Sequence, residues 1–221
     1  MVKTLTYTDA VLTYVADTGV REHAVLKTCR DETIAMGGIS RMQISPEQGA
    51  FMTLLVRALG VRNAVEVGTF TGYSAIAIAR GLPDDGYLLC CDVSEEWTAI
   101  ARRAWDAAGV ADRIELRLAP ALDTLRALPA QENIDLAFVD ADKPAYAAYY
   151  EELLPRLRPN GVILVDNTLW GGAVVDSPVE GVADDENTVA LRAFNEMVAA
   201  DDRVEVALLT LGDGLTLIRK R

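Results

Sequence analysis

Short apolar runs alternate with longer amphipathic segments along most of the chain. Apolar runs bounded by Gly, Asp or Asn are typical of strands, whereas apolar residues spaced three and four apart are typical of helices. We therefore predict strands at 63–68, 86–92, 112–119, 134–140 and 161–166. Between and after them we predict helices at 73–82, 94–110, 121–128, 144–157 and about 186–200.

Local start and turn signals support these elements. Ser94 stands at the start of the second predicted helix, where its side chain is a good N-cap. Pro144 stands near the start of the fourth, where its missing N–H leaves no helical hydrogen bond unmade. The segment 203–220 is predicted to form a hairpin that turns at Gly212-Asp213-Gly214. The segment before the first strand, residues 1–58, has a helical pattern.

The pattern of the strands predicts the fold class. The runs at 63–67, 136–139 and 162–165 lack polar alternation, as expected for parallel strands that are buried on both faces. Strands interleaved with helices indicate an α/β fold, so we expect a Rossmann-like three-layer sandwich. Its seven-stranded sheet should be mostly parallel, with an antiparallel strand from the C-terminal hairpin. We expect one domain over 1–221, in which 1–58 form part of the substrate or dimer surface.

Charge and hydropathy limit the partners. The 221 residues carry a net charge of −12, which disfavours a broad basic surface for nucleic acid. No run reaches the roughly 18 apolar residues of a membrane span. The N-terminal stretch, which carries Asp9 and Asp17, lacks the pattern of a signal peptide. We therefore expect a cytoplasmic protein with no nucleic-acid or membrane partner.

Cysteine and histidine usage argues against several kinds of site. The three cysteines are odd in number, and Cys90 and Cys91 are adjacent, so neither a disulfide framework nor a cysteine-based metal site is expected. Both should pack inside a strand. His23 is the only histidine, which leaves little material for a serine–histidine triad or a histidine-rich metal site. We expect His23 on a helix surface, with a contact to substrate as the alternative.

Polar residues and glycines follow the ends of the first two predicted strands. In open α/β sheets, ligands bind outside the carboxyl ends of the strands. Gly68 and Gly72 permit a tight turn, but their G-x-x-x-G spacing is not the G-x-G-x-x-G of dinucleotide enzymes. Asp92 ends the second strand, where an acid can accept hydrogen bonds from a ribose. A ligand with a ribose and a carboxylate but no pyrophosphate, such as S-adenosylmethionine, fits this pattern; the alternative is that these residues only shape and cap turns.

The ends of the fourth and fifth predicted strands carry a second group of oxygen donors. Asp140 closes the fourth strand, and Asp166 and Asn167 close the fifth. Their oxygens are hard ligands that suit Mg²⁺ or Ca²⁺ and not Zn²⁺. If the two strands are neighbours, the three side chains converge and leave about half of a six-coordinate shell for substrate and water. Taken alone, either aspartate could equally cap a turn.

Six segments together resemble a known family. They are MQISPEQGAF, VEVGTFTGYSA, GVADRIELRLAPALDTL, DLAFVDADK, VDNTLWGG and GDGLTLIRK. The chain from about Met42 to Leu217 resembles the cation-dependent class I O-methyltransferases, which include caffeoyl-CoA and catechol O-methyltransferases. The caffeoyl-CoA and bacterial branch is the more similar one. The first forty residues match poorly, and in this family they help to shape the acceptor pocket.

The resemblance implies a role for each matching residue. The metal would be held by Asp140, Asp166 and Asn167, with Mg²⁺ expected and Ca²⁺ or Mn²⁺ as alternatives. S-adenosylmethionine would bind against Met42, Glu66, Gly68, Thr69, Ser74, Asp92, Pro120, Ala121 and Asp140. Within that set, Asp92 would hold the ribose and Ser74 would lie near the methionine carboxylate. Lys143 matches a proposed general base, and Trp170 with the long loop at 170–186 would flank the acceptor ring.

The residue types agree with this chemistry. A vicinal diol can chelate a divalent cation, which makes the bound hydroxyl more acidic. A cation near Lys143 disfavours its protonated form, so the amine can take the proton. We therefore expect methyl transfer to a catechol-type acceptor such as a caffeoyl compound, with free catechols favoured over CoA esters because no basic cluster for the CoA phosphates stands out. Lys143 could instead be a solvated lysine at a helix start.

Other function classes and the oligomeric state stay open. A nicotinamide-dependent oxidoreductase on a similar fold is one alternative, although the dinucleotide motif is absent. A non-catalytic ligand-binding protein is another. Members of the family are commonly homodimers, and an early helix with an apolar face at Val11, Leu12, Val15 and Ala16 could form such an interface or pack on its own domain.

Overall fold

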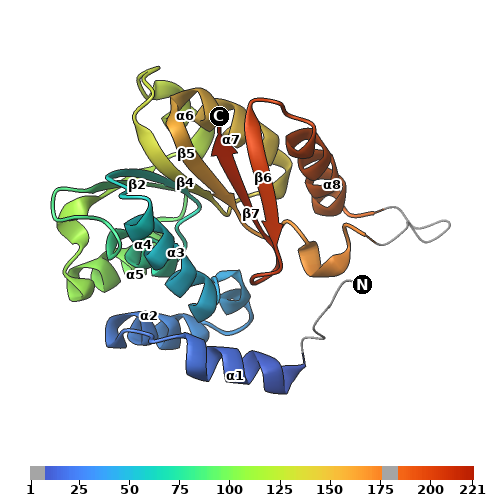
Figure 1. Cartoon of the computed structure of the whole chain (residues 1–221). Coiled ribbons are helices and arrows are strands. Elements are labelled where there is room, and N and C mark those ends of the chain that lie inside the picture. The colour runs from blue at the N-terminus through green and yellow to red at the C-terminus, as the bar shows by residue number, and fades with distance from the viewer. Residues whose placement is uncertain (1–7, 176–183) are drawn as a thin grey trace.

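A seven-stranded sheet runs through the middle of the computed structural model, which describes residues 8–175 and 184–221 (Figure 1). In order across the sheet, its strands are β3 (Ile114–Leu118), β2 (Tyr87–Asp92), β1 (Asn63–Val67), β4 (Ile134–Val139), β5 (Leu157–Val165), β7 (Leu215–Lys220) and β6 (Val204–Leu209). Only β7 runs antiparallel to its neighbours, β5 and β6. The prediction of a mostly parallel sheet with an antiparallel strand from the C-terminal hairpin is confirmed.

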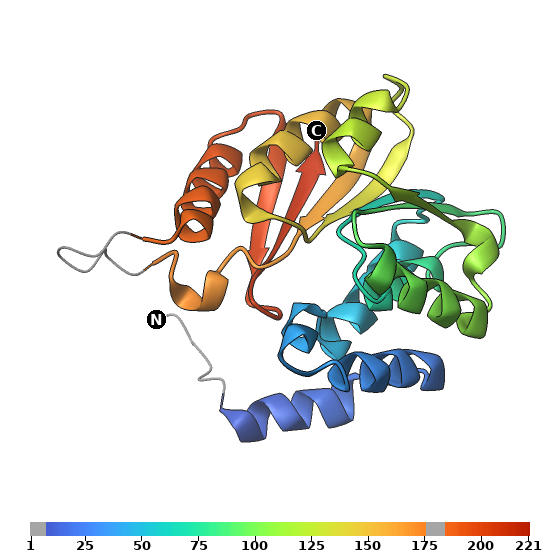
Figure 2. The ribbon, with the colours of Figure 1, turned by 180° about the vertical axis from the view of Figure 1, so that it is seen from behind.

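Helices cover both faces of the sheet. One layer contains α3 (Pro46–Ala58), α4 (Tyr73–Ala79) and α5 (Glu95–Ala108). The other, which Figure 2 shows from behind, contains α6 (Ala121–Ala127), α7 (Tyr146–Leu153) and α8 (Glu186–Ala199). Because successive strand residues point to opposite faces, each face has its own buried apolar cluster; in β1, Ala64 belongs to the first and Val65 to the second. Both faces of the central strands are therefore buried.

The helix starts follow the caps in the sequence. Ser94 Oγ accepts a hydrogen bond from Trp97 N at 3.2 Å, as predicted for the N-cap of α5. Gly109 ends that helix in the left-handed conformation that glycine tolerates best. In the same way, Ser45 caps α3 and Asp185 caps α8. Local sequence is therefore sufficient to set these boundaries.

Two predicted elements differ from the structure. The helix expected at 144–157 is divided into the 3₁₀ turn η3 (Lys143–Ala145), α7 and the 3₁₀ turn η4 (Leu154–Arg156). Each 3₁₀ turn contains a proline, which cannot donate a helical hydrogen bond. The strand expected at 161–166 begins earlier, at Leu157, because Leu157 pairs with Ile134 before the register shifts.

The N-terminal segment lies beneath the carboxyl ends of the parallel strands. It contains α1 (Asp9–Gly19), α2 (Ala24–Ile34) and the 3₁₀ helix η1 (Gly37–Met42), so its predicted helical character is confirmed from residue 8 onward. Figure 1 shows α1 and α2 below the sheet; α2 packs on α4 and α5. β1 lies between β2 and β4, so the chain order reverses there, which is where ligands bind in open α/β sheets.

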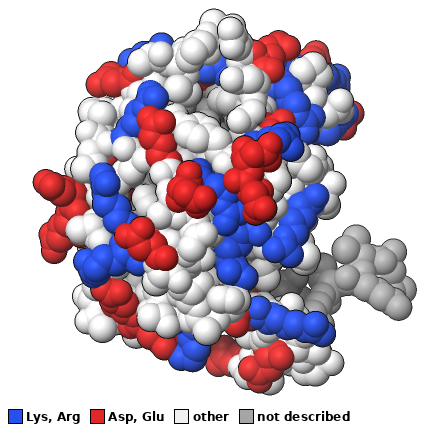
Figure 3. All heavy atoms as spheres, turned by 90° about the vertical axis from the view of Figure 1, so that its left-hand side faces the viewer, with Lys and Arg blue, Asp and Glu red and all other residues white. Residues whose placement is uncertain are grey.

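Other sequence interpretations concern the interior and the surface. Cys90 and Cys91 are buried in β2, and His23 is an exposed N-cap of α2, as expected. No helix within residues 8–175 and 184–221 is long and apolar enough to cross a membrane. On the face in Figure 3, acidic and basic side chains are interspersed. That face therefore lacks the broad basic patch that favours nucleic acid.

Candidate active site

A cavity of about 1380 Å³ opens at the carboxyl ends of β1, β2, β4 and β5. Twelve of the predicted site residues line it: Met42, Gly68, Thr69, Ser74, Asp92, Pro120, Ala121, Asp140, Lys143, Asp166, Asn167 and Trp170. The thirteenth, Glu66, is fully buried and is not part of the lining. The sequence therefore identified residues that the fold brings to one place.

The loop after β1 is shaped by close backbone contacts. Gly68 has φ +90°, and a β-carbon there would lie 1.9 Å from the backbone oxygen of Asp140. Gly72 has φ +87°, and a β-carbon there would lie 2.7 Å from the indole nitrogen of Trp105. A side chain at Gly68 would push the loop away from the end of β4, and one at Gly72 would push it away from α5, so both glycines are required by the packing.

Asp92 organises the same loop from the end of β2. One carboxylate oxygen, Oδ2, accepts hydrogen bonds from Thr69 N at 2.9 Å and Phe70 N at 2.8 Å. The other, Oδ1, accepts one from Ser94 N at 2.8 Å. Asp92 therefore joins the first two strand ends while it lines the cavity, so its turn-capping geometry and a ligand contact are compatible.

Glu66 lies under this loop as part of the support of the cavity. Its Oε2 accepts hydrogen bonds from Thr69 Oγ1 at 3.0 Å and Cys90 Sγ at 3.3 Å. Its Oε1 has no hydrogen-bond partner among the residues that the structure describes. Burial raises the pKa of Glu66 to about 7, because an apolar environment disfavours the charged carboxylate.

The expected oxygen donors meet because β4 and β5 are neighbours. Val139 and Val165 are paired in the sheet, so Asp140 and Asp166 leave it side by side. The Lys143 ammonium donates to Asp140 Oδ1 at 3.0 Å and to Asn167 Oδ1 at 2.6 Å. A positive group therefore already lies between two of the three expected metal ligands.

The electrostatics of this cluster favour a divalent cation. Burial and, to a smaller extent, the nearby Asp140 carboxylate raise the pKa of Asp166 to about 7. Burial also raises the pKa of Asp140, although the Lys143 ammonium opposes this. The third oxygen comes from an amide; no group of three histidine, cysteine or carboxylate side chains suited to a metal occurs in the described parts of the chain. Two carboxylates and an amide are hard donors that fit Mg²⁺, Mn²⁺ or Ca²⁺.

The segment that follows β5 is held by the turn of the β6–β7 hairpin. Asn167 has φ 58° and Trp170 has φ 49°, which is uncommon for residues other than glycine. Leu169 N donates to the backbone oxygen of Asp213 at 3.0 Å, and Gly171 N donates to Asp213 Oδ1 at 2.6 Å. These bonds hold Asn167 toward Lys143 and place the Trp170 ring 5.8 Å from the Lys143 ammonium. Part of the predicted functional loop at 170–186 lies outside the described residues.

Sequence reasoning missed several residues at the site. Tyr146 accepts a hydrogen bond from Lys143 Nζ at 2.7 Å and donates to the backbone oxygen of Asp166 at 3.1 Å. Its position three residues after Lys143 was a usable signal. Gln48 and Arg41 also line the cavity. Gln48 lies inside the recognised MQISPEQGAF segment, but nothing in the sequence shows that it lines the cavity.

Comparison with known proteins identifies the family. A family model described as O-methyltransferase matches residues 16–221, nearly the whole chain. The chain belongs to this O-methyltransferase family. It is an S-adenosylmethionine-dependent O-methyltransferase of the caffeoyl-CoA type, as the resemblance implied. This assignment decides against the nicotinamide-dependent oxidoreductase.

Individual relatives agree with the family assignment. Caffeoyl-CoA O-methyltransferase 2 of Zea mays is 39% identical over 227 residues, which cover 99% of this chain and 85% of the relative. A solved O-methyltransferase from Bacillus cereus, in complex with S-adenosylhomocysteine, is 33% identical with a TM-score of 0.84, over 96% of this chain and 97% of that one. The O-methyltransferase TomG from Streptomyces achromogenes, in complex with S-adenosylmethionine, is 32% identical with a TM-score of 0.85, over 96% of each chain.

Proposed function

We propose that this O-methyltransferase is cation-dependent and transfers the methyl group of S-adenosylmethionine to one oxygen of a catechol-type aromatic, such as a caffeoyl compound. The observation that carries the proposal is the cluster of Asp140, Asp166 and Asn167 around the Lys143 ammonium in the family's cavity. These donors are the expected holders of the cation. A bound cation would act as a Lewis acid that makes a coordinated hydroxyl more acidic.

Lys143 is the group that we assign to the proton. In the structure its ammonium has three hydrogen-bond acceptors: Asp140, Asn167 and the Tyr146 hydroxyl. With Asp140 and Asn167 as holders of the cation, Lys143 would keep the Tyr146 hydroxyl as its hydrogen-bond partner. To act as the base, the Lys143 ammonium must first release its own proton; the amine would then take the proton of the acceptor hydroxyl. The oxygen would attack the sulfonium methyl, with S-adenosylhomocysteine as the leaving group. The protein would otherwise contribute by holding the acceptor oxygen in line with the sulfonium methyl.

The proposed cofactor-binding part of the cavity has residues that line it and one residue, Glu66, that lies beneath it. Asp92 lines it at the end of β2, where its carboxylate suits the ribose hydroxyls. Ser74, in the first turn of α4, is assigned to the methionine carboxylate, Met42 to the methionine end, and Pro120 and Ala121 to the adenine; all four line the cavity. Glu66 acts from below the loop. The relatives with bound S-adenosylhomocysteine or S-adenosylmethionine support this use of the cavity.

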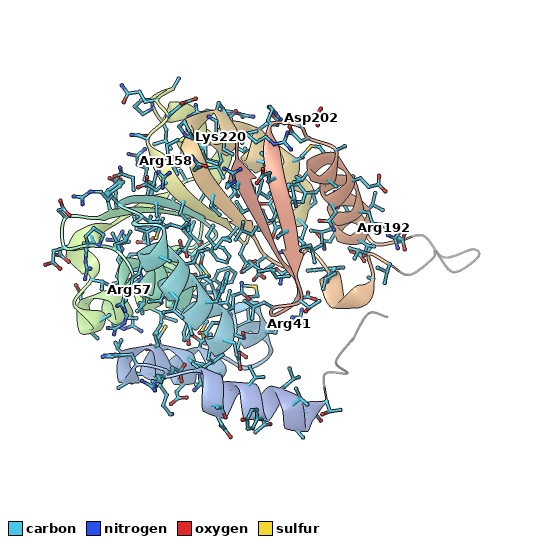
Figure 4. The ribbon with its side chains drawn as sticks, viewed as in Figure 1. Arg41, Arg57, Arg158, Arg192, Asp202 and Lys220 are labelled. Atoms are coloured by element: carbon cyan, nitrogen blue, oxygen red, sulfur yellow. The ribbon has the colours of Figure 1, made fainter. Side chains whose placement is uncertain are left out.

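Among the described residues that line the cavity, Arg41 is the one cation apart from Lys143. Arg41, at the end of η1, lines the cavity and makes no hydrogen bond or ion pair with any described residue. Figure 4 places it beside the turn of the β6–β7 hairpin. One free guanidinium suits a single carboxylate better than the several phosphates of CoA. We therefore favour free catechols such as caffeic acid, although relatives are named for the CoA ester.

A comparison of three acceptors tests this proposal. Caffeic acid should be methylated faster than its CoA ester, and p-coumaric acid, which has one ring hydroxyl, should be much slower than either. A lone phenol offers the cation one ligand where a catechol offers two. Equal rates on p-coumaric acid would show that chelation does not select the acceptor, even for an active methyltransferase. Turnover of none of the three would favour a different acceptor or a non-catalytic protein.

We also propose that the protein is a cytoplasmic homodimer with no nucleic-acid or membrane partner. The support for the dimer is α1, which has no fully buried residue and leaves three large apolar side chains exposed: Leu12 at 50%, Tyr14 at 68% and Val15 at 41%. Val11 and Ala16, the other members of the predicted face, are half-buried. A second copy of the chain would remove this surface from water.

A further inference from the structure

Gln48 is a buried polar residue at the start of α3. Its backbone N–H donates to the capping Ser45 Oγ at 3.3 Å, so its main chain is satisfied within the first turn. Its side chain is only 1% exposed, yet it belongs to the lining of the cavity. A glutamine in such a position needs partners for both ends of its amide.

The oxygen and the nitrogen of the Gln48 amide differ in their surroundings. Its Oε1 faces the hairpin turn at Gly212, where an added β-carbon would lie 2.6 Å from that oxygen. The turn therefore leaves little room for the side chain to move away. Its Nε2 has no hydrogen-bond partner at normal distance among the described residues. A buried donor that makes no hydrogen bond destabilises the fold, so its position calls for an explanation.

The nearest explanation is Asp166. This carboxylate is 3% exposed, and its Oδ1 accepts a hydrogen bond from Asn167 N at 2.9 Å. Gln48 and Asp166 line the same cavity, and the hairpin turn that meets Gln48 Oε1 is bonded to the segment after Asp166, since Thr168 N donates to the backbone oxygen of Gly214 at 3.0 Å. A single backbone donor leaves a carboxylate free to rotate about its Cβ–Cγ bond, whereas a second donor from another direction fixes it. Gln48 is placed to be that second donor.

We propose that Gln48 is a positioning residue for the cation site: its Nε2 donates to the Asp166 carboxylate and holds the orientation in which Asp166 binds the cation. This rests on the proposed cation site. Groups that hydrogen-bond to metal ligands fix their orientation, and their loss typically weakens metal binding by about 10- to 100-fold. The same contact would couple three distant segments at Asp166: the start of α3, the end of β5 and the hairpin turn.

The test is Mn²⁺ binding, measured by electron paramagnetic resonance in the presence of S-adenosylhomocysteine. Gln48→Met keeps the length of the side chain and removes the donor, and Gln131→Met makes the same change at an exposed position away from the cavity. We expect Gln48→Met to bind Mn²⁺ about 10- to 100-fold more weakly. Its affinity for S-adenosylhomocysteine should equal that of the wild type, and Gln131→Met should match the wild type in both measurements.

The outcomes separate this proposal from the one on which it rests. If the wild type binds no Mn²⁺, the proposed cation site itself is contradicted. Equal Mn²⁺ affinity of the wild type and Gln48→Met would overturn the role of Gln48 alone. Weaker S-adenosylhomocysteine binding with unchanged Mn²⁺ binding would also overturn it and place Gln48 in the cofactor site. If Gln48→Met does not fold, Gln48→Asn, which keeps the amide but draws it back from Asp166, should show the same loss of Mn²⁺ affinity.

Discussion

Replacement of Glu66 by glutamine isolates the effect of a carboxylate that is buried beneath the cofactor loop. The substitution fits the hydrogen-bond pattern. Thr69 and Cys90 both donate to Oε2, which the amide oxygen of glutamine can replace. Oε1 has no partner, so the amide nitrogen of glutamine would take a place where no existing bond is broken. The variant therefore resembles the protonated form of Glu66 in shape and charge.

The expected effect depends on pH, and its sign follows from the raised pKa. The pKa of Glu66 rises from an ordinary 4.5 to about 7 on folding. Below pH 4.5 the carboxyl is protonated in both states; between pH 4.5 and 7 the unfolded chain releases the proton and the folded protein retains it. The free energy of unfolding of the wild type should therefore fall through this window. Each pKa unit corresponds to about 1.4 kcal/mol, which gives a total of about 3 kcal/mol.

Urea unfolding of both proteins at half-unit steps from pH 4.5 to 8 measures this effect. The difference between the two free energies of unfolding removes the titration of Asp140 and Asp166, which both proteins share. We expect the free energy of unfolding of the Glu66→Gln variant to rise by about 3 kcal/mol relative to that of the wild type between pH 4.5 and 7. This difference should not change further up to pH 8. A difference that is independent of pH would refute the assignment of a buried, proton-retaining carboxyl to Glu66.

Three other predictions concern the cofactor, the cation and the oligomer. Asp92→Ala should weaken S-adenosylhomocysteine binding by about 1.5–3 kcal/mol, the range for a hydrogen bond to a charged group, and unchanged affinity in calorimetry would reject its ribose role. Asp166→Ala should weaken Mn²⁺ binding far more than S-adenosylhomocysteine binding; equal losses would contradict a role limited to the cation. Sedimentation at micromolar concentration should give a dimer and Leu12→Asp a monomer, whereas a monomeric wild type would exclude an interface on α1.

Most of the fold could be predicted because its signals are local. Strands that are buried on both faces appear as unbroken apolar runs, and the cap at Ser94 and the turn at Gly212–Gly214 mark boundaries within a few residues. Only one of the two errors has a non-local cause: the early start of β5 depends on its register with β4. The division of the helix at 144–157 follows from the prolines in the two 3₁₀ turns, which are visible in the sequence.

Site residues could be predicted from the sequence only where they stand at the ends of strands. Parallel strands deliver their ends to one edge, so Asp92, Asp140 and Asp166 could be grouped before the structure was known. Gln48 could not, because its position at the cavity depends on the start of α3 meeting the turn of the β6–β7 hairpin. Glu66 also shows the limit of the sequence: the same strand position can line a ligand or lie beneath it, and burial decides which.

The central claim is that methyl transfer depends on a divalent cation held at the ends of β4 and β5. The most direct measurement is the rate of methyl transfer from S-adenosylmethionine to caffeic acid after EDTA treatment and removal of the chelator, before and after Mg²⁺ is added back. We predict that the treated enzyme is inactive, that it still binds S-adenosylhomocysteine in calorimetry, and that Mg²⁺ restores its rate. Full activity in the metal-free preparation would contradict the claim.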